Sequence, residues 1–269
     1  MQNKTLSLNK LKLVSLVLAV LVAVMRVVEY KSYYNSETGI LDGSYVFTII
    51  AIGIVLIFTV LLVVMTLKNK DESEFKLEKN QPKGIMQAVS FALMVPSIMY
   101  LFGTWSGYKN GTVYSENATD ATFILPVAVA TVLMMIFVLV TAFINISGLN
   151  IYEKAPILGI IPALWGLLLL LYFFVHDSTY IVKSENYYIL LAAVAVLSSM
   201  LAYTRAYVFG DNGKRAKLLK ATCPAAIALT LGYAISEMYF HFSGFERLKS
   251  LPFEMSILYF AVAVFELAI

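Results

Sequence analysis

The sequence predicts an all-α integral membrane protein with eight transmembrane helices, and three observations lead to that prediction. First, hydrophobic residues make up 60% of the 269 residues and charged residues only 14%, and the mean hydropathy is +0.79. A soluble fold of this length has too much surface relative to its volume to bury such an apolar chain. Second, the apolar residues form long runs, and third, Lys and Arg gather in alternate segments between these runs.

Each run is long enough to cross the hydrocarbon of a bilayer, which takes about 20 residues of helix. The runs must be helical, because lipid offers no hydrogen-bond partner to a backbone N–H or C=O group. No soluble domain is expected, since the longest polar segment between the runs is the mixed-charge stretch 68–83. The eight runs occupy residues 11–29, 44–67, 85–104, 122–145, 156–175, 187–209, 219–241 and 251–269.

The first run has the charge pattern of a signal peptide, because three lysines, Lys4, Lys10 and Lys12, come at or before its start. A signal peptide ends in a cleavage site formed by small residues. Here Arg26 and Val27 follow the most apolar part of the run, and no such site is evident. We therefore expect the first run to be retained as a transmembrane helix.

The distribution of Lys and Arg predicts the orientation, because cytoplasmic loops carry more basic residues than the loops on the other side of a membrane. With eight spans and a cytoplasmic N-terminus, 14 of the 20 basic residues lie in inner segments, five lie in outer segments and Arg26 lies within the first span. Both chain termini are then cytoplasmic. The five outer residues are Lys31, Lys109, Lys183, Arg247 and Lys249.

An internal match divides the chain into two similar halves. The stretch Ser-Ile-Met-Tyr-Leu-Phe at 97–102 resembles Ser-Glu-Met-Tyr-Phe-His at 236–241, and each ends an outward-running span. Leu-Pro pairs at 125–126 and 251–252 also begin the last span of each half. These features predict a tandem repeat of two four-helix units, 1–147 and 148–269, in the same orientation. Parallel repeats of this kind occur in transporters, whose binding sites favour the interface between the repeats.

Several titratable side chains near the predicted outer boundary are candidates for binding a solute or an ion. Charged side chains within a membrane are costly, so each one suggests a function. A helix rises about 21 Å from Lys12 to Arg26 and about 25 Å from Lys220 to Glu237, which puts both charges near the outer surface. The candidate site residues are Arg26, Glu29, Glu237, His241 and Glu254.

Helical spacing groups these candidates. Arg26 and Glu29 are three residues apart and share a helix face, so they can pair, and Glu237 shares a face with His241. Two interpretations remain open. The charges either line a polar vestibule that holds a cation, a proton or a zwitterion, or they form interfacial ion pairs that stabilise neighbouring helices. Glu266, at the inner boundary, is expected to be solvated.

Helix breakers and small residues interrupt several of the runs. Pro96, Pro162 and Pro224 fall within predicted spans and are expected to kink them. The single cysteine, Cys223, lies in an apolar run and is interpreted as a small buried residue. Small residues allow membrane helices to approach closely. Glycines that suit such an approach are Gly53, Gly159, Gly166 and Gly232.

The sequence shows none of the common enzyme motifs. It has no His-Glu-x-x-His zinc pair, no phosphate-binding loop and no Gly-x-Ser-x-Gly nucleophile elbow. Its two histidines, His176 and His241, have no neighbours at the spacing of metal ligands. We therefore predict no catalytic residue, no cofactor, no metal site and no nucleic-acid partner, and we rank an intramembrane enzyme third among the functions.

The first outer loop carries a resemblance to a protein family. Arg26-Val-Val-Glu29-Tyr30 ends the first span, and Glu37-Thr38-Gly39 follows in the loop. This arrangement resembles uncharacterised multi-pass membrane proteins of low-GC Gram-positive anaerobes. The resemblance covers about the first two spans. It implies a bacterial plasma membrane as the location, and it brings no activity with it.

The leading functional hypothesis is a transporter or binding protein for a small solute or ion, with an outward-facing polar vestibule between the first, seventh and eighth spans. The alternative is a non-catalytic structural or sensory subunit that partners another envelope protein in the membrane. Either function requires the lipid bilayer as a partner. A transporter should place the charges around a cavity that reaches the middle of the membrane, whereas a structural subunit should pair them in a dry helix interface.

Overall fold

The computed structural model describes eight stretches of the chain, and each contains one α-helix. The stretches are residues 8–35, 46–68, 80–111, 118–148, 156–178, 183–208, 214–244 and 252–269. Each predicted apolar run corresponds to one of these helices, so the all-α prediction is confirmed for the described residues. The helices are α1 (Leu8–Tyr33), α2 (Val46–Lys68), α3 (Gln81–Lys109), α4 (Ala118–Ser147), α5 (Ile161–Ser178, preceded by the short 3-10 helix η1, Pro156–Ile160), α6 (Lys183–Val208), α7 (Lys214–Phe242) and α8 (Phe253–Ala268).

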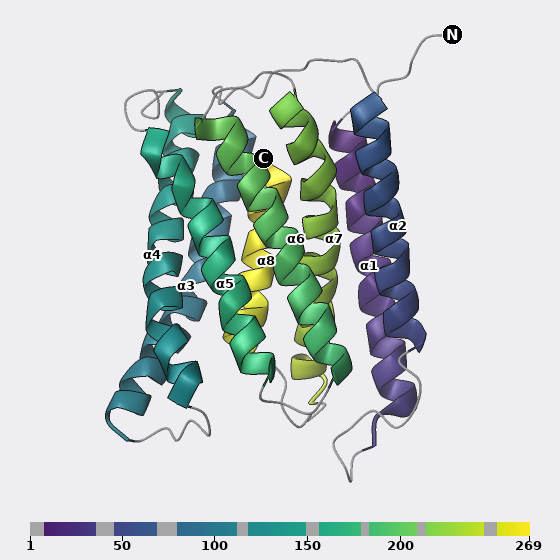
Figure 1. Ribbon diagram of the computed structural model, residues 1–269, viewed down its shortest axis with the longest axis vertical. Helices are drawn as coiled ribbons and strands as arrows, with labels where there is room; N and C mark the ends of the chain where they lie inside the picture. The colour runs from purple at the N-terminus through teal and green to yellow at the C-terminus, as the bar shows by residue number, and fades with distance from the viewer. Residues whose placement is uncertain are drawn as a thin grey trace.

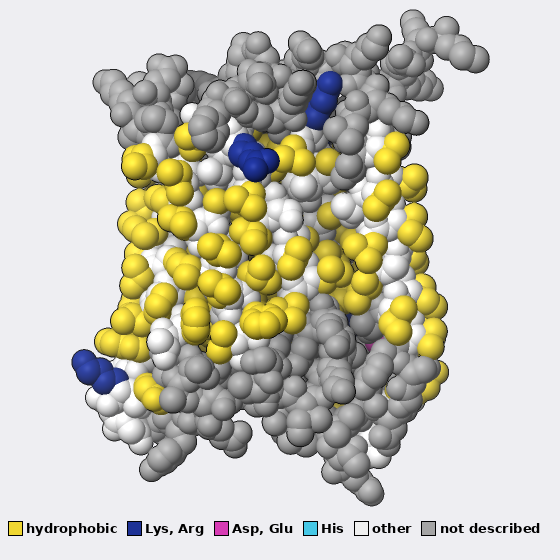
Figure 2. Space-filling model, in the orientation of Figure 1, with side chains coloured by type: hydrophobic (Ala, Val, Ile, Leu, Met, Phe, Trp, Pro, Cys, Tyr) yellow, Lys and Arg dark blue, Asp and Glu magenta, His cyan; other side chains and the backbone are white. Residues whose placement is uncertain are grey.

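Six of these helices, α1 and α3 to α7, are long and apolar enough to cross a membrane. The described apolar part of α2, Ile49–Leu61, is shorter, and α8 has 16 residues, or about 24 Å of helix. Figure 2 shows apolar side chains in a broad band across the middle of one face, with Lys and Arg side chains at its upper and lower margins. The chain is therefore a multi-pass membrane protein. Three points remain predictions: the total of eight spans, the tandem repeat and the cytoplasmic location of both termini.

Six helices, α3 to α8, form a closed ring in which each helix packs against the next and α8 packs against α3. Outside the ring, α1 and α2 lie against each other and against α7, at one side of the bundle (Figure 1). Aromatic side chains fill the ring. Phe173 on α5 stacks on Tyr259 on α8 with centroids 5.5 Å apart, and Tyr203 on α6 meets Phe265 on α8 at 5.8 Å. All four are buried, so the ring is packed at these levels.

Two serines on one face of α3 hold this helix against α8. Ser90 Oγ donates to the main-chain oxygen of Ala261 at 2.7 Å, and Ser97 Oγ donates to that of Glu254 at 2.8 Å. Residues seven apart lie on the same face of a helix, and small polar residues at a membrane interface bring two backbones within reach of a hydrogen bond. The partners run in opposite order along the chain, so α3 and α8 are antiparallel.

The helix with the largest buried share among the six apolar helices is α7, which packs against α1, α2, α6 and α8. Gly232 lets α1 approach α7 closely, because a Cβ atom at this position would lie 2.8 Å from Val22 Cγ1. The close approaches expected at Gly159 and Gly166 are also confirmed. No described residue comes within 4 Å of the Cβ position of Gly53, so the expectation for this glycine is wrong.

The three prolines predicted to interrupt spans all lie within helical spans, and a fourth proline lies inside α4. Pro96 in α3 and Pro224 in α7 lie inside helices as expected. Pro162 lies inside the candidate membrane span Ile157–Val175, where the 3-10 helix η1 changes to α5, so it interrupts the regular α-helix of this span as expected. Pro126 does not begin the fourth span, because α4 begins at Ala118 and continues past this proline.

Candidate functional site

Four charged side chains are buried in the described part of the chain, with exposed fractions of 1% for Arg26 and Glu29, 5% for Glu237 and 0% for Glu266. Arg26 and Glu237 belong to one cluster and Glu266 to another at the opposite end of the bundle, and Glu29 lies one helical turn from Arg26. In Figure 1, α1 begins at the upper end of the bundle. We call this end the Lys12 end and the opposite end the Arg26 end, after two residues of α1.

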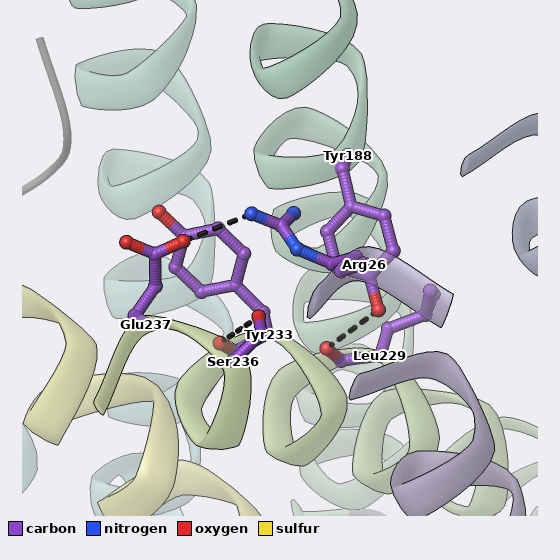
Figure 3. A network of polar contacts seen from close by, with 6 residues as sticks. All are labelled: Arg26, Tyr188, Leu229, Tyr233, Ser236 and Glu237. Carbon is purple, nitrogen blue, oxygen red and sulfur yellow. Dashed lines mark hydrogen bonds and ion pairs between the residues drawn. The ribbon is translucent and has the colours of Figure 1, made fainter. Parts of the chain in front are cut away.

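An ion pair between α1 and α7 forms the centre of the Arg26 end. Arg26 Nη2 donates to Glu237 Oε1 at 2.9 Å, across 211 residues of sequence (Figure 3). Further out along both helices, the rings of Tyr30 and Phe240 pack with centroids 5.0 Å apart. Residue numbers rise together along the two helices at these contacts, so α1 and α7 are parallel and in a fixed register.

Tyrosine rings surround the guanidinium group of Arg26. Its Cζ atom lies 4.7 Å from the ring centroids of both Tyr188 on α6 and Tyr233 on α7, and 6.0 Å from that of Tyr30. The Tyr188 hydroxyl donates to the main-chain oxygen of Leu229 at 3.3 Å, which fixes this ring (Figure 3). Guanidinium is more weakly hydrated than ammonium and stacks well on aromatic faces, so this shell suits an arginine.

The Arg26 cluster, made of Arg26, Glu237, Tyr30, Tyr188 and Tyr233, joins three helices directly and a fourth through Tyr259 on α8, whose ring packs on Tyr233 at 5.3 Å. Both partners of the ion pair are buried, so the pair is closed to solvent in this conformation. Removing one partner of such a pair leaves a buried charge without compensation and typically costs about 3–5 kcal/mol. The cluster therefore has a large influence on how α1 sits against α7.

The other predicted site residues lie in three different settings. Glu29 is buried one helical turn from Arg26 on α1. Glu254 lies half-buried in the first turn of α8, where a negative charge interacts favourably with the helix dipole. His241 is exposed, and its ring stacks on Phe253 at 4.2 Å. The structure thus brings Arg26 and Glu237 together and places His241 outside the cluster.

A second cluster, which the sequence does not predict, lies at the Lys12 end. Glu266 is expected to be solvated, but this expectation is wrong, because its side chain is fully buried. Its Oε1 atom forms a hydrogen bond with Ser199 Oγ on α6, and Cys223 Sγ on α7 donates to its main-chain oxygen at 3.2 Å. The Oε2 atom accepts no hydrogen bond from the described residues.

Two lysines complete what we call the Glu266 cluster, which consists of Glu266, Ser199, Cys223, Lys12 and Lys83. Lys12 Nζ on α1 donates to the main-chain oxygen of Leu267 at 2.6 Å, and Lys83 Nζ on α3 donates to that of Ile269 at 2.9 Å. Cations at a helix C-terminus satisfy carbonyl groups that lack intrahelical partners. A sequence signal for this contact exists: Lys83 precedes Ser90 and Ser97 at intervals of seven residues, and all three bind α8.

Neither cluster has the composition of a metal centre. No group of three or more His, Cys, Asp or Glu side chains that could hold a metal ion occurs among the described residues. The chemistry that both clusters offer is the binding of charge and of protons. Comparisons of the chain with protein-family models, with curated proteins and with solved structures found no match.

Proposed function

We propose that this multi-pass protein is a transporter or binding protein for a small cation in a bacterial plasma membrane, and that the Arg26 cluster is its site in a closed state. The observation that carries the proposal is a buried cationic group held between tyrosine faces and a carboxylate. Aromatic faces and carboxylates are the groups that recognise organic cations. A second acid, Glu29, is buried one turn away on α1.

In this proposal Arg26 occupies the place that a cationic substrate takes in the open state. The substrate competes with Arg26 for Glu237 and for the faces of Tyr188 and Tyr233. Release of the guanidinium weakens the attachment of α1 to α7, because the ion pair and the tyrosine shell are contacts between these helices and α6. Substrate binding and movement of α1 are thereby coupled.

One observation favours the alternative, a structural or sensory subunit. The ion pair is buried between helices that are distant in sequence, which is the arrangement of a clamp that fixes α1 against α7. A clamp affects stability alone, whereas a substrate site also affects flux. The two functions differ in what they require of the individual charges.

An experiment that exchanges the two charges of the ion pair distinguishes the two functions. The protein is reconstituted into liposomes, and uptake of radiolabelled tetraethylammonium is followed together with proton movement reported by entrapped pyranine. The double variant Arg26→Glu with Glu237→Arg keeps an ion pair between α1 and α7 but reverses its polarity. We expect the double variant to fold and to lose uptake. Lys31→Gln is the control, because Lys31 is exposed on α1 and lies 5.1 Å over Tyr239 of α7.

Two results would refute the transport proposal. The first is that liposomes with the wild-type protein take up tetraethylammonium and protons no faster than empty liposomes do. The second is uptake by the double variant at the wild-type rate, which would mean that only the pairing matters. If either occurs while each single variant unfolds more readily than the wild type, the clamp is the better description.

The orientation that this proposal requires has a separate test. In a Cys223→Ser background, cysteines replacing Lys109 and Lys183 should react with a membrane-impermeant maleimide added outside intact cells. A cysteine replacing Lys76 should react only after the cells are opened. The opposite labelling pattern would place the Arg26 cluster on the cytoplasmic side.

A further inference from the structure

We propose that Glu266 is a reversible proton-binding site, in which Oε1 of the buried carboxyl group takes a proton from the aqueous phase at the Lys12 end. The step transfers one proton from a hydronium ion to Oε1, and it leaves water and a neutral carboxyl group. Proton binding at this position is separate from the Arg26 cluster and does not depend on the transport proposal. Any use of the proton in transport would rest on that proposal.

The hydrogen bonds of Ser199 favour a protonated Glu266 side chain. Its hydroxyl oxygen lies within hydrogen-bonding distance of Glu266 Oε1 and, at 2.9 Å, of the main-chain oxygen of Val196. A hydroxyl has one proton and cannot donate fully to two acceptors. With a proton on Oε1, Glu266 donates to Ser199 Oγ, and Ser199 donates to Val196. All three oxygens are then satisfied by two protons.

The absence of a paired cation beside the Glu266 carboxyl group, among the described residues, also favours the protonated form. An ionised carboxylate that is removed from water requires a close counter-ion or several hydrogen bonds. Within the described residues neither Lys12 nor Lys83 forms an ion pair with the carboxylate, because both ammonium groups donate to main-chain oxygens at the end of α8. Oε2 accepts no hydrogen bond from the described residues. The neutral acid therefore suits this setting better than an isolated charge.

The other groups around Glu266 make its proton removable. Lys12 on α1 and Lys83 on α3 place positive charge at the same end of α8, which favours the ionised form. From α7 the thiol of Cys223 faces Glu266, and from α6 the ring of Tyr203 packs on the neighbouring Phe265. Burial and the two lysines thus act in opposite directions on the same proton.

A proton fits this cluster better than a metal cation. Metal cations require several oxygen ligands. The main-chain oxygens of Glu266, Leu267 and Ile269 already accept hydrogen bonds from Cys223, Lys12 and Lys83. The two ammonium groups would also repel a metal ion, whereas a proton requires one oxygen only.

Infrared difference spectroscopy of the purified full-length protein in nanodiscs tests the proposal without any flux measurement. Spectra are compared across a pH series in buffers without added sodium, and the series is then repeated with sodium added. We expect a carbonyl-stretch band of a protonated carboxyl group that appears on acidification and is absent from Glu266→Gln. Glu254→Gln is the matched control, because Glu254 lies on the same helix but is partly exposed. This variant should keep the band.

Ser199→Ala supplies the second test and keeps the proposal falsifiable if Glu266→Gln does not fold. If the neutral acid donates to Ser199, removing the hydroxyl weakens the neutral form, and the band should titrate at a lower pH. A shift to higher pH would mean that Ser199 stabilises the ionised form, and it would overturn the proposal. Four other results would also overturn the proposal. They are a band that is unchanged in Glu266→Gln, no band at any pH, a band present at every pH, and a midpoint that follows the sodium concentration.

Discussion

Glu237 and Glu266 are both buried acids on neighbouring helices, α7 and α8, yet their cationic neighbours behave differently. Glu237 receives the guanidinium of Arg26 directly, at 2.9 Å. Near Glu266, the ammonium groups of Lys12 and Lys83 bind main-chain oxygens instead. The planar, weakly hydrated guanidinium can serve a carboxylate and two aromatic faces together. The compact ammonium caps a helix end, and it leaves the carboxyl group to bind a proton.

Buried charges therefore have different roles at the two ends of this protein. At the Arg26 end the charges are matched, so removing either should disturb the packing of two helices. At the Lys12 end the carboxyl group is unmatched, so its replacement by a neutral residue of the same shape should be tolerated. Three predictions, in order of decreasing effect, test the contrast.

The largest effect on stability is expected when one residue of the ion pair is replaced by a neutral one. Glu237→Gln or Arg26→Gln removes one partner of the buried ion pair and should lower the free energy of unfolding by about 3–5 kcal/mol. Glu266→Gln should cost at most about 1 kcal/mol, because the carboxamide can still donate to Ser199. Equilibrium unfolding in detergent measures both. Equal losses at Glu237 and Glu266 would remove the distinction between the two clusters, and Lys31→Gln should change stability by less than about 0.5 kcal/mol.

An intermediate effect is expected when the spacing of α1 and α7 is changed. In Gly232→Ala the added Cβ atom would lie 2.8 Å from Val22 Cγ1, so α1 must move outward and the ion pair must lengthen. We expect a loss of about 1–3 kcal/mol, as for other overpacked positions. Gly53→Ala on α2 is the matched control, since none of the residues that the structure describes lies within 4 Å of its Cβ position. A similar loss in both variants would show that the close approach does not matter.

The smallest effect is expected for a lysine that caps α8. Lys12→Met removes the donor to the main-chain oxygen of Leu267 and should cost about 0.3–1 kcal/mol, the usual size of a cation at a helix C-terminus. Hydrogen exchange should accelerate in the last turn of α8 and remain unchanged around Arg26. Lys31→Met, at the other end of α1, is the control. Faster exchange around Arg26 in Lys12→Met would show that the two clusters are not independent.

Much of the fold could be predicted because a membrane requires long apolar helices. The run predicted at 219–241 lies inside α7 (Lys214–Phe242), and the other runs match their helices similarly. The cost of an intramembrane charge also made Arg26 and Glu237 candidates, and the structure brings these two side chains together. Their pairing could not be predicted, since local spacing favours Glu29 as the partner of Arg26. Contact between residues 211 apart depends on how whole helices pack.

The burial of Glu266 and the exposure of His241 have one geometric reason. Distance along a helix gives the depth of a residue, but it does not show whether water or another helix lies beside it. Glu266 is at the depth of a boundary, yet α6 and α7 cover it. His241 is four residues from Glu237, yet it lies in the last turn of α7 and is exposed. Neighbouring helices, and not depth, decide which of these side chains is buried.

The register of α1 against α7 has a consequence for biosynthesis. Arg26 and Glu237 are separated by 211 residues, and a ribosome adds about 5–20 residues per second, so roughly 10–40 s pass between them. During this interval α1 already has the length and apolarity to enter the bilayer. Its guanidinium then has to stay at the lipid headgroups or beside an insertion factor until α7 is made. Slowing translation before α7 should therefore lengthen the contact of nascent α1 with the insertion machinery.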